Sequence, residues 1–233
     1  MPKQQFLRDF RAAVSNERLD MYRQRGVSGG DENLLIHYAW NIVLAESLYP
    51  TLQCLEVALR NSVHDAASNA YETPYWFDTP DLLDPRFAEG IAQAKTDLEN
   101  KGKSITPAGI IAEQSFGFWS SLFNRSQEQV LWPKIHKKAF PNIPQHLRKR
   151  GTISSRLRDI RTLRNRIMHH EPIWYIRDLG DTHQNILQMV KWISPAMAEF
   201  VETIDRFPEL YSSGMSAFQS DFEKRFSRIS PER

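Results

Sequence analysis

The stretch TISSRLRDIRTLRNRIMHH, residues 152–170, has the apolar spacing of one long amphipathic helix. Its apolar side chains recur every three or four residues, which places them on one face at about 100° per residue. These side chains are Ile153, Leu157, Ile160, Leu163 and Ile167. Thr152 and Ser154 are the candidate N-caps. Pro172 disfavours helical geometry at Glu171, so we expect the helix to end at His170.

The same periodicity continues along most of the chain. Residues 31–49 and 50–71 predict two consecutive helices, because Pro50 suits the first turn of a new helix. The other expected helices cover 86–101, 109–123, 182–193 and 194–207, with a weaker one over 214–233 and short pieces between the prolines of 132–144. No pair of strands and no repeat is evident. We therefore predict an all-α bundle that forms a single domain over residues 1–233.

The composition indicates a protein of the cytoplasm. The single cysteine, Cys54, excludes an intramolecular disulfide and a cysteine-based zinc site, and it fits a reducing compartment. The first residues, MPKQQFLRDFRAAV, lack the continuous apolar core of a signal peptide. We also see no apolar run close to the roughly 18 residues of a membrane span, and expect no membrane segment.

Positive charge is concentrated in one place. Residues 146–170 contain eight Lys and Arg residues and one acid, Asp159, although the whole chain has a formal charge of only +2. The remainder, with 22 basic and 27 acidic residues, carries a net charge of −5. Acids normally interleave on a solvated helix face, so this density indicates contact with a polyanion.

Two arginines fall inside the apolar face of the basic helix. These are Arg156 and Arg164, and a guanidinium in such a position needs a carboxylate or a cleft, because an unpaired buried charge costs several kcal/mol. Glu56, which flanks the apolar stripe of residues 50–71, is the candidate partner, with Asn61 further round that helix. An ion pair that only fixes the helix register remains an equal alternative.

The adjacent histidines, His169 and His170, are not spaced for a metal. Neighbouring residues on a helix point about 100° apart, whereas a chelating pair needs positions i and i+4. We expect no metal here. The two imidazoles could cap the last helical carbonyls or serve chemistry on the solvent side, and the spacing does not choose between these roles.

The aromatic segment SFGFWSSLF, residues 115–123, has helical spacing typical of a core. We interpret its large side chains, and Trp76, Trp132 and Trp174, as packing residues and not as base-stacking platforms.

Five segments, in their order and spacing, resemble the Abi-like proteins of bacteria, which are named for abortive phage infection. They are YAWNIVLAESLYPTLQCLEVALRNSV, YWF, SFGFWSSLF, LWP and LRNRIMHHEPIW. That family belongs to the HEPN superfamily, whose signature is Arg-x4–6-His with a polar residue after the arginine. Here the signature reads Arg164, Asn165, three further residues and His169. The resemblance covers residues 33–175, which leaves 176–233 as a helical C-terminal extension.

The resemblance implies an HEPN-like bundle with metal-independent endoribonuclease activity and no cofactor. Arg164 and His169 would be catalytic, Asn165 would orient the site or bind a phosphate, and Glu56, Asn61 and His170 would support them. The products would be a 2′,3′-cyclic phosphate and a 5′-hydroxyl. Histidine suits both proton transfers near neutral pH, and the arginine fork suits phosphate oxygens.

The partners that follow from this interpretation are RNA and a second copy of the chain. Arg156, Arg158, Arg161 and Arg166 would form the track that attracts RNA. One His169 cannot easily act on both sides of the phosphorus at once, so we expect a symmetric homodimer with two. The resemblance also implies a toxin or phage-defence effector. An RNA or protein antitoxin is then a further candidate partner. The alternative is a non-catalytic RNA-binding or regulatory HEPN module.

Overall fold

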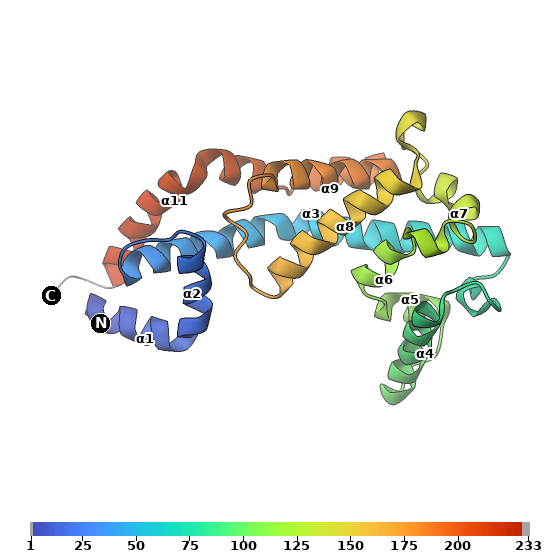
Figure 1. Cartoon of the computed structure of the whole chain (residues 1–233), viewed down its shortest axis with the longest axis horizontal. Helices are drawn as coiled ribbons and strands as arrows, with labels where there is room; N and C mark the ends of the chain where they lie inside the picture. The colour runs from blue at the N-terminus through green and yellow to red at the C-terminus, as the bar shows by residue number, and fades with distance from the viewer. Residues whose placement is uncertain (1, 230–233) are drawn as a thin grey trace. The chain divides into compact units, whose positions relative to one another are not determined.

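The computed structural model describes residues 2–229, and within this range the chain forms helices and turns without a strand (Figure 1). The predicted all-α class is confirmed. In chain order the elements are α1 Lys3–Val14, α2 Asn16–Gln24, α3 Asp31–Tyr71, η1 Trp76–Asp78, α4 Pro85–Asn100, α5 Pro107–Glu113, α6 Phe116–Ser121, η2 Arg125–Gln127, α7 Trp132–Ala139, η3 Gln145–Leu147, α8 Arg150–Met168, α9 Leu179–Ile193, α10 Pro195–Glu202 and α11 Phe207–Ile229.

The chain divides into two compact units. Unit 1 comprises Met1–Pro50, Leu163–His183 and Asp205–Arg233, and unit 2 comprises Thr51–Thr162 and Gln184–Ile204. Helices α3, α8 and α9 contribute residues to both units. We predicted a single domain over residues 1–233. Whether the two units fold as one domain stays a prediction.

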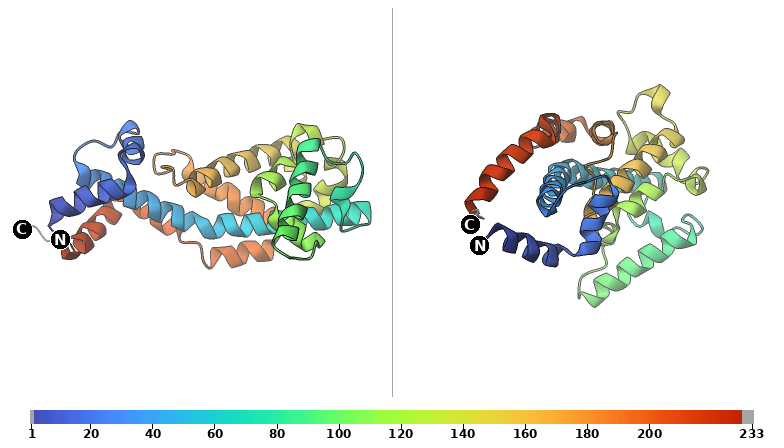
Figure 2. Two further views of the ribbon diagram at one scale, coloured as in Figure 1. Left: turned by 90° about the horizontal axis from the view of Figure 1, so that it is seen from below. Right: turned by 60° about the vertical axis from the view of Figure 1, so that its left-hand side comes forward.

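Unit 1 is built around a small aromatic core. Its buried centre consists of Leu19, Tyr22, Val27 and Leu34, against which Phe10, Val14, Tyr38 and Trp174 pack. The first and last helices of this unit lie side by side, α1 beside the end of α11 (Figure 2). The rings of Phe6 and Phe226 meet there edge to face, with centroids 5.0 Å apart, a geometry favoured for aromatic pairs.

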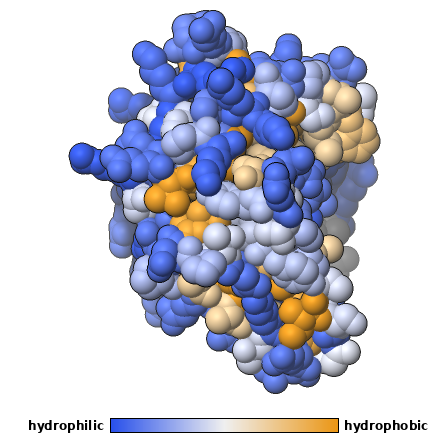
Figure 3. Space-filling model, turned by 90° about the vertical axis from the view of Figure 1, so that its right-hand side faces the viewer, coloured by the Kyte–Doolittle hydropathy of each residue, from blue (hydrophilic) through white to orange (hydrophobic). Residues whose placement is uncertain are grey.

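Unit 2 buries the aromatic segment, as the sequence predicted. The side chains of Phe116, Trp119, Leu122 and Phe123 are at most 2% exposed, and Trp76 is fully buried. Phe118 is half-buried and packs edge-on against Phe87, with ring centroids 5.5 Å apart. The face of the molecule in Figure 3 is mostly hydrophilic, with small separate apolar areas. Scattered apolar groups of that kind are normal on a protein surface.

Helix α3 runs through Pro50, so the prediction of two helices that meet there is wrong. Proline removes one backbone hydrogen bond and costs about 3 kcal/mol in a helix interior. Leucines bury on both sides of it, at Leu44, Leu48, Leu52 and Leu55, each at most 4% exposed. Because each buried leucine contributes roughly 1.5–3 kcal/mol, this stripe outweighs the cost of the proline.

Other helix boundaries also differ from the prediction. α8 begins at Arg150, two residues before the expected cap, so Thr152 and Ser154 lie inside the helix. Residues 109–123 do not form one helix, because the hydroxyl of Ser115 accepts the N–H of Phe118 at 3.3 Å and begins α6 separately.

The C-terminal helices end or bend away from their predicted limits. The helix expected over 194–207 is α10, which stops at Glu202. Gly214, with φ of +73°, bends the terminal helix α11, and residues 230–233 of the predicted 214–233 helix lie outside the described residues.

One helix of the described chain is long and apolar enough to cross a membrane, although we expected none. An 18-residue window of α3 has a mean hydropathy of 1.3, and 44% of that window is buried within the protein. These are properties of length and composition alone, and the buried core helix of a soluble protein has them too. The cytoplasmic location stays a prediction.

A buried histidine and aspartate join the start of α9 to the segment before α11. Nε2 of His183 lies 2.7 Å from Oδ2 of Asp205, with side-chain exposures of 1% and 4%. Burial lowers the pKa of His183, although the Asp205 carboxylate opposes the shift. The imidazole is therefore neutral near pH 7 and donates its Nε2–H to the carboxylate.

We predict that Asp205→Ala destabilises the protein by about 1–3 kcal/mol, because it leaves a buried N–H without an acceptor. The free energy of unfolding in urea measures this effect. Asp221→Ala is the matched control, since that carboxylate is 69% exposed and pairs with Lys224 on the surface. Its cost should stay below about 1 kcal/mol. Equal losses for the two variants would contradict the role of the buried pair.

Candidate functional site

His169 and His170 lie in the turn that ends α8, which we call the histidine turn. The helix stops at Met168, two residues before the predicted end at His170. Glu171 N–H donates to the Arg166 carbonyl at 2.8 Å, and His170 N–H donates to the Ile167 carbonyl at 3.0 Å. His170 has φ of +57°. These are the bonds of a Schellman motif, with a histidine in the left-handed position that glycine usually occupies.

A side chain from α2 closes the end of α8. Nη1 of Arg18 donates to the His170 carbonyl at 2.7 Å and to the His169 carbonyl at 3.4 Å. A cation is also favoured at this end of a helix dipole. Arg18 thus caps the carbonyls of the two histidines, whereas one interpretation gave the capping of this helix end to the histidine side chains.

Asn41 of α3 fixes the backbone that follows the histidines. Its side chain is 4% exposed. Its Nδ2 donates to the Glu171 carbonyl at 3.3 Å, and its Oδ1 accepts the N–H of Ile173 at 2.7 Å. One amide therefore spans Pro172 and holds the segment on both sides of it.

The imidazoles of His169 and His170 are both exposed. Among residues 2–229, no side-chain or backbone group forms a hydrogen bond with either ring. Their backbones are fixed while their rings face solvent. This arrangement leaves both rings available for proton transfer, which is the second of the two predicted roles.

The other signature residues lie on the last turns of α8. Asn165 is exposed, and its carbonyl accepts the N–H of His169 at 2.9 Å. Arg164 is half-buried between positions whose apolar side chains are buried. Glu56 and Asn61 belong to unit 2, whereas Arg164 belongs to unit 1. The ion pair between Glu56 and Arg164 stays a prediction.

Arg156, one of the arginines of the predicted RNA track, is half-buried. It donates to Oε1 of Gln188, and its guanidinium lies 4.4 Å from the centre of the Trp192 ring. Burial lowers the pKa of Arg156, yet a guanidinium remains charged in proteins. Its contacts within unit 2 hold it against α9, so it offers less to an external phosphate than an exposed arginine does.

Arg158 and Arg161 differ in their exposure. The Arg158 side chain is 65% exposed, 3.9 Å from Asp159 and within 3.1 Å of the Ser155 hydroxyl. Arg161 is half-buried and donates to the Ser121 hydroxyl at 2.8 Å. Of the three track arginines in unit 2, Arg158 is the one that projects into solvent.

In unit 1, Arg166 and Arg25 both approach the ring of Tyr175. Their guanidinium carbons lie 5.9 Å and 4.5 Å from its centre, and Arg166 also donates to the Tyr175 hydroxyl. Neither arginine forms an ion pair with a carboxylate of residues 2–229. Arg166 of α8 and Arg25 at the end of α2 therefore meet at Tyr175, which follows the histidine turn, and two such cations are a favourable setting for an anion.

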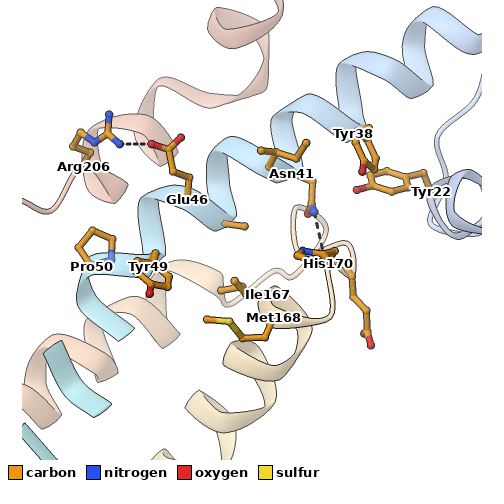
Figure 4. Close-up of a pocket in the computed structure, with 13 residues that line it drawn as sticks. Tyr22, Tyr38, Asn41, Glu46, Tyr49, Pro50, Ile167, Met168, His170 and Arg206 are labelled. Carbon is orange, nitrogen blue, oxygen red and sulfur yellow. Dashed lines mark hydrogen bonds and ion pairs between the residues drawn. The ribbon is translucent and has the colours of Figure 1, made fainter. Parts of the chain in front are cut away.

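A cavity of about 570 Å³ adjoins the turn within unit 1 (Figure 4). It lies between α3 and the end of α8, and His170 contributes to its wall. Tyr22 and Tyr38 lie at the same end as His170, whereas Glu46 and Arg206 lie at the other (Figure 4). Burial raises the pKa of Tyr22 well above its ordinary value, so its hydroxyl stays protonated.

No group of three or more His, Cys, Asp or Glu side chains among residues 2–229 is placed to hold a metal ion. Comparisons of the chain with protein-family models, with curated proteins and with solved structures give no match.

Sequence reasoning missed the residues that hold the turn. Asn41 had a signal, because it is a polar residue inside the apolar run YAWNIVL. A buried amide in such a run must find hydrogen-bond partners. Arg18 had no signal of this kind, since its partners lie 151 and 152 residues away.

We predict that His170→Gly keeps or raises stability by up to about 1 kcal/mol, because glycine enters the left-handed region without steric cost. His170→Val should lower the unfolding free energy by more than about 1 kcal/mol, since a β-branched residue is strained there. Thermal and urea unfolding measure both. His169→Gly is the matched control and should destabilise the protein. If glycine were equally harmful at both positions, the assigned turn geometry would be wrong.

Proposed function

We propose that this chain is a metal-independent endoribonuclease of the HEPN type, related to the Abi-like proteins and acting as a toxin or phage-defence effector. One observation carries the proposal. Two exposed imidazoles, His169 and His170, sit on a turn whose backbone is fixed by Arg18 and Asn41, while the rings themselves make no hydrogen bond within residues 2–229. A fixed backbone with solvent-facing rings is the arrangement that proton transfer at this turn would need.

The chemistry needs one group to remove the 2′-hydroxyl proton and one to protonate the leaving 5′-oxygen. An imidazole does either near neutral pH, and general acid–base catalysis contributes about 10²–10⁴-fold. The attack of the 2′-oxygen gives a 2′,3′-cyclic phosphate and releases a 5′-hydroxyl. In this proposal His169 transfers protons, Arg164 stabilises the charge on the phosphate oxygens, and Asn165 orients the phosphate.

RNA would approach along basic side chains beside the turn and on the solvent side of α8. Arg166 and Arg25 serve this purpose beside the turn, and Arg158 serves it on the exposed face of α8 in unit 2. Such contacts bind the phosphate backbone without reading the sequence, and they weaken as salt increases.

A symmetric homodimer would supply the second proton-transfer group. The attacked and leaving oxygens lie on opposite sides of the phosphorus, and one imidazole cannot reach both at the same moment. A two-fold partner brings a second His169 to the same phosphate. His170 points from a left-handed residue and not from the helix, so in this scheme it supports the site.

We predict that the purified protein cleaves a mixed RNA pool in excess EDTA. The products should carry 2′,3′-cyclic phosphate and 5′-hydroxyl ends, which enzymatic end analysis identifies. His169→Ala should lower the rate about 10²–10⁴-fold. His146→Ala is the matched control, because His146 is also exposed within the basic region but lies in η3 of unit 2.

Cleavage that requires a metal and leaves 5′-phosphates would overturn the mechanism. RNA binding with a strong salt dependence but without cleavage would instead favour the alternative, a non-catalytic RNA-binding or regulatory module.

We predict further that mixed dimers of wild-type and His169→Ala chains lose far more than half of the activity. Both histidines serve one cut in the composite site, so one missing imidazole disables the shared site. Differently tagged chains, purified as heterodimers and assayed at single turnover, provide the measurement. Retention of half the activity would mean that the two sites act independently. If sedimentation shows a monomer and that monomer is fully active, the dimer proposal is excluded.

A further inference from the structure

The cavity beside His170 collects apolar side chains that the fold leaves uncovered. Ile42, Tyr49 and Met168 are 51%, 50% and 37% exposed, and all three line this one space. Ile42 and Tyr49 are two turns apart on α3, and Met168 is the last residue of α8. Covering apolar surface contributes roughly 25 cal/mol per Å². Exposed apolar groups gathered at a hollow are typical of a binding site.

Polar groups stand at both ends of the cavity. The Tyr22 hydroxyl is fully buried near the Asn41 amide and forms no hydrogen bond of good geometry within the described residues. At the far end, Arg206 donates to Glu46 at 2.6 Å, and both side chains are more than half exposed. The cavity thus offers apolar walls with the exposed Glu46 and Arg206 side chains at one end, the usual character of a site for a small organic ligand.

The size of the cavity suits a flat ring system with a sugar. Small-molecule sites have volumes of about 300–1,000 Å³, and this cavity has about 570 Å³. Tyr49 supplies an exposed aromatic ring, and Met168 supplies a polarisable thioether (Figure 4). Proteins that bind single-stranded nucleic acid stack bases on aromatic rings of this kind.

The position of the cavity selects among possible ligands. His170 is part of its wall and Glu171 follows in the same turn, so any occupant lies against the histidine turn. A nucleotide matches this layout, because its base fits the apolar space while its phosphate lies at the histidines.

We propose that this cavity binds the base of the nucleotide next to the cleaved phosphate, with Tyr49 as the stacking residue. The inference deepens the proposed ribonuclease function and rests on it for the identity of the natural ligand. It assigns recognition of unstacked, single-stranded RNA to the site, because a base inside a duplex cannot enter a cavity. Stacking makes this recognition tolerant of base identity.

Calorimetric titration of guanosine 3′-monophosphate into the full-length protein tests the proposal. The nucleotide should bind, and Tyr49→Ala should weaken it by about fivefold to 100-fold, the loss expected when one stacked base loses its aromatic partner. Ribose 5-phosphate, which has no base, should bind more weakly and should not respond to Tyr49→Ala. Tyr75→Ala is the control variant, since Tyr75 is 41% exposed but lies in unit 2. Circular dichroism checks that both variants fold.

The outcomes separate this inference from the ribonuclease proposal. If the protein binds the nucleotide through Tyr49 but cuts no RNA, the base-binding site is supported and the ribonuclease proposal is contradicted. A protein that cuts RNA but binds the nucleotide no better than ribose 5-phosphate would overturn the base site alone. Unchanged nucleotide affinity in Tyr49→Ala would also overturn it.

Discussion

The arrangement of the histidine turn depends on one buried amide, that of Asn41. Proline at 172 cannot donate a backbone hydrogen bond, and the residues beside it have left the helix, so this segment has few bonds of its own. The Asn41 side chain supplies a donor for Glu171 and an acceptor for Ile173. Because α3 is a long helix with many buried residues, it holds the Asn41 amide in place, and the amide in turn restrains the backbone of the loop. The Asn41 amide thus fixes the backbone at Glu171 and Ile173, while the Schellman bonds and Arg18 fix it at His170.

The helical class was predictable because it rests on local spacing. Apolar stripes such as that of 153–167 identify helices whatever their surroundings, and those side chains are indeed buried. The wrong prediction at Pro50 has a different cause. Proline does disfavour a helix interior, but α3 is stabilised by leucines that residues distant in sequence bury, and a rule based on local sequence does not include that burial. Likewise, Ser115 divides 109–123 because its hydroxyl competes for a backbone N–H.

The chemistry proposed for the candidate site comes from the types of its residues, Arg164, Asn165 and His169, and it stays a prediction. The residues that support the site could not be predicted in this way. They are Arg18 and Asn41, more than a hundred residues away. The helical wheel also misplaced His170, because it continued helical geometry two residues beyond Met168, where α8 ends. Left-handed geometry is hard to foresee at a histidine, since glycine is the usual signal for it.

The proline inside α3 has a consequence for how that helix opens. Without an N–H at Pro50, the Glu46 carbonyl lacks its usual intrahelical donor, and the ladder of backbone bonds has one gap near the middle of a 41-residue helix. Helices melt cooperatively because each backbone hydrogen bond stabilises the next one. A missing bond weakens this coupling between the two sides of the gap. Fraying that begins at one end can therefore stop at residue 50. By geometry α3 is one helix, but we expect its two halves to open separately, each with its own free energy of local unfolding.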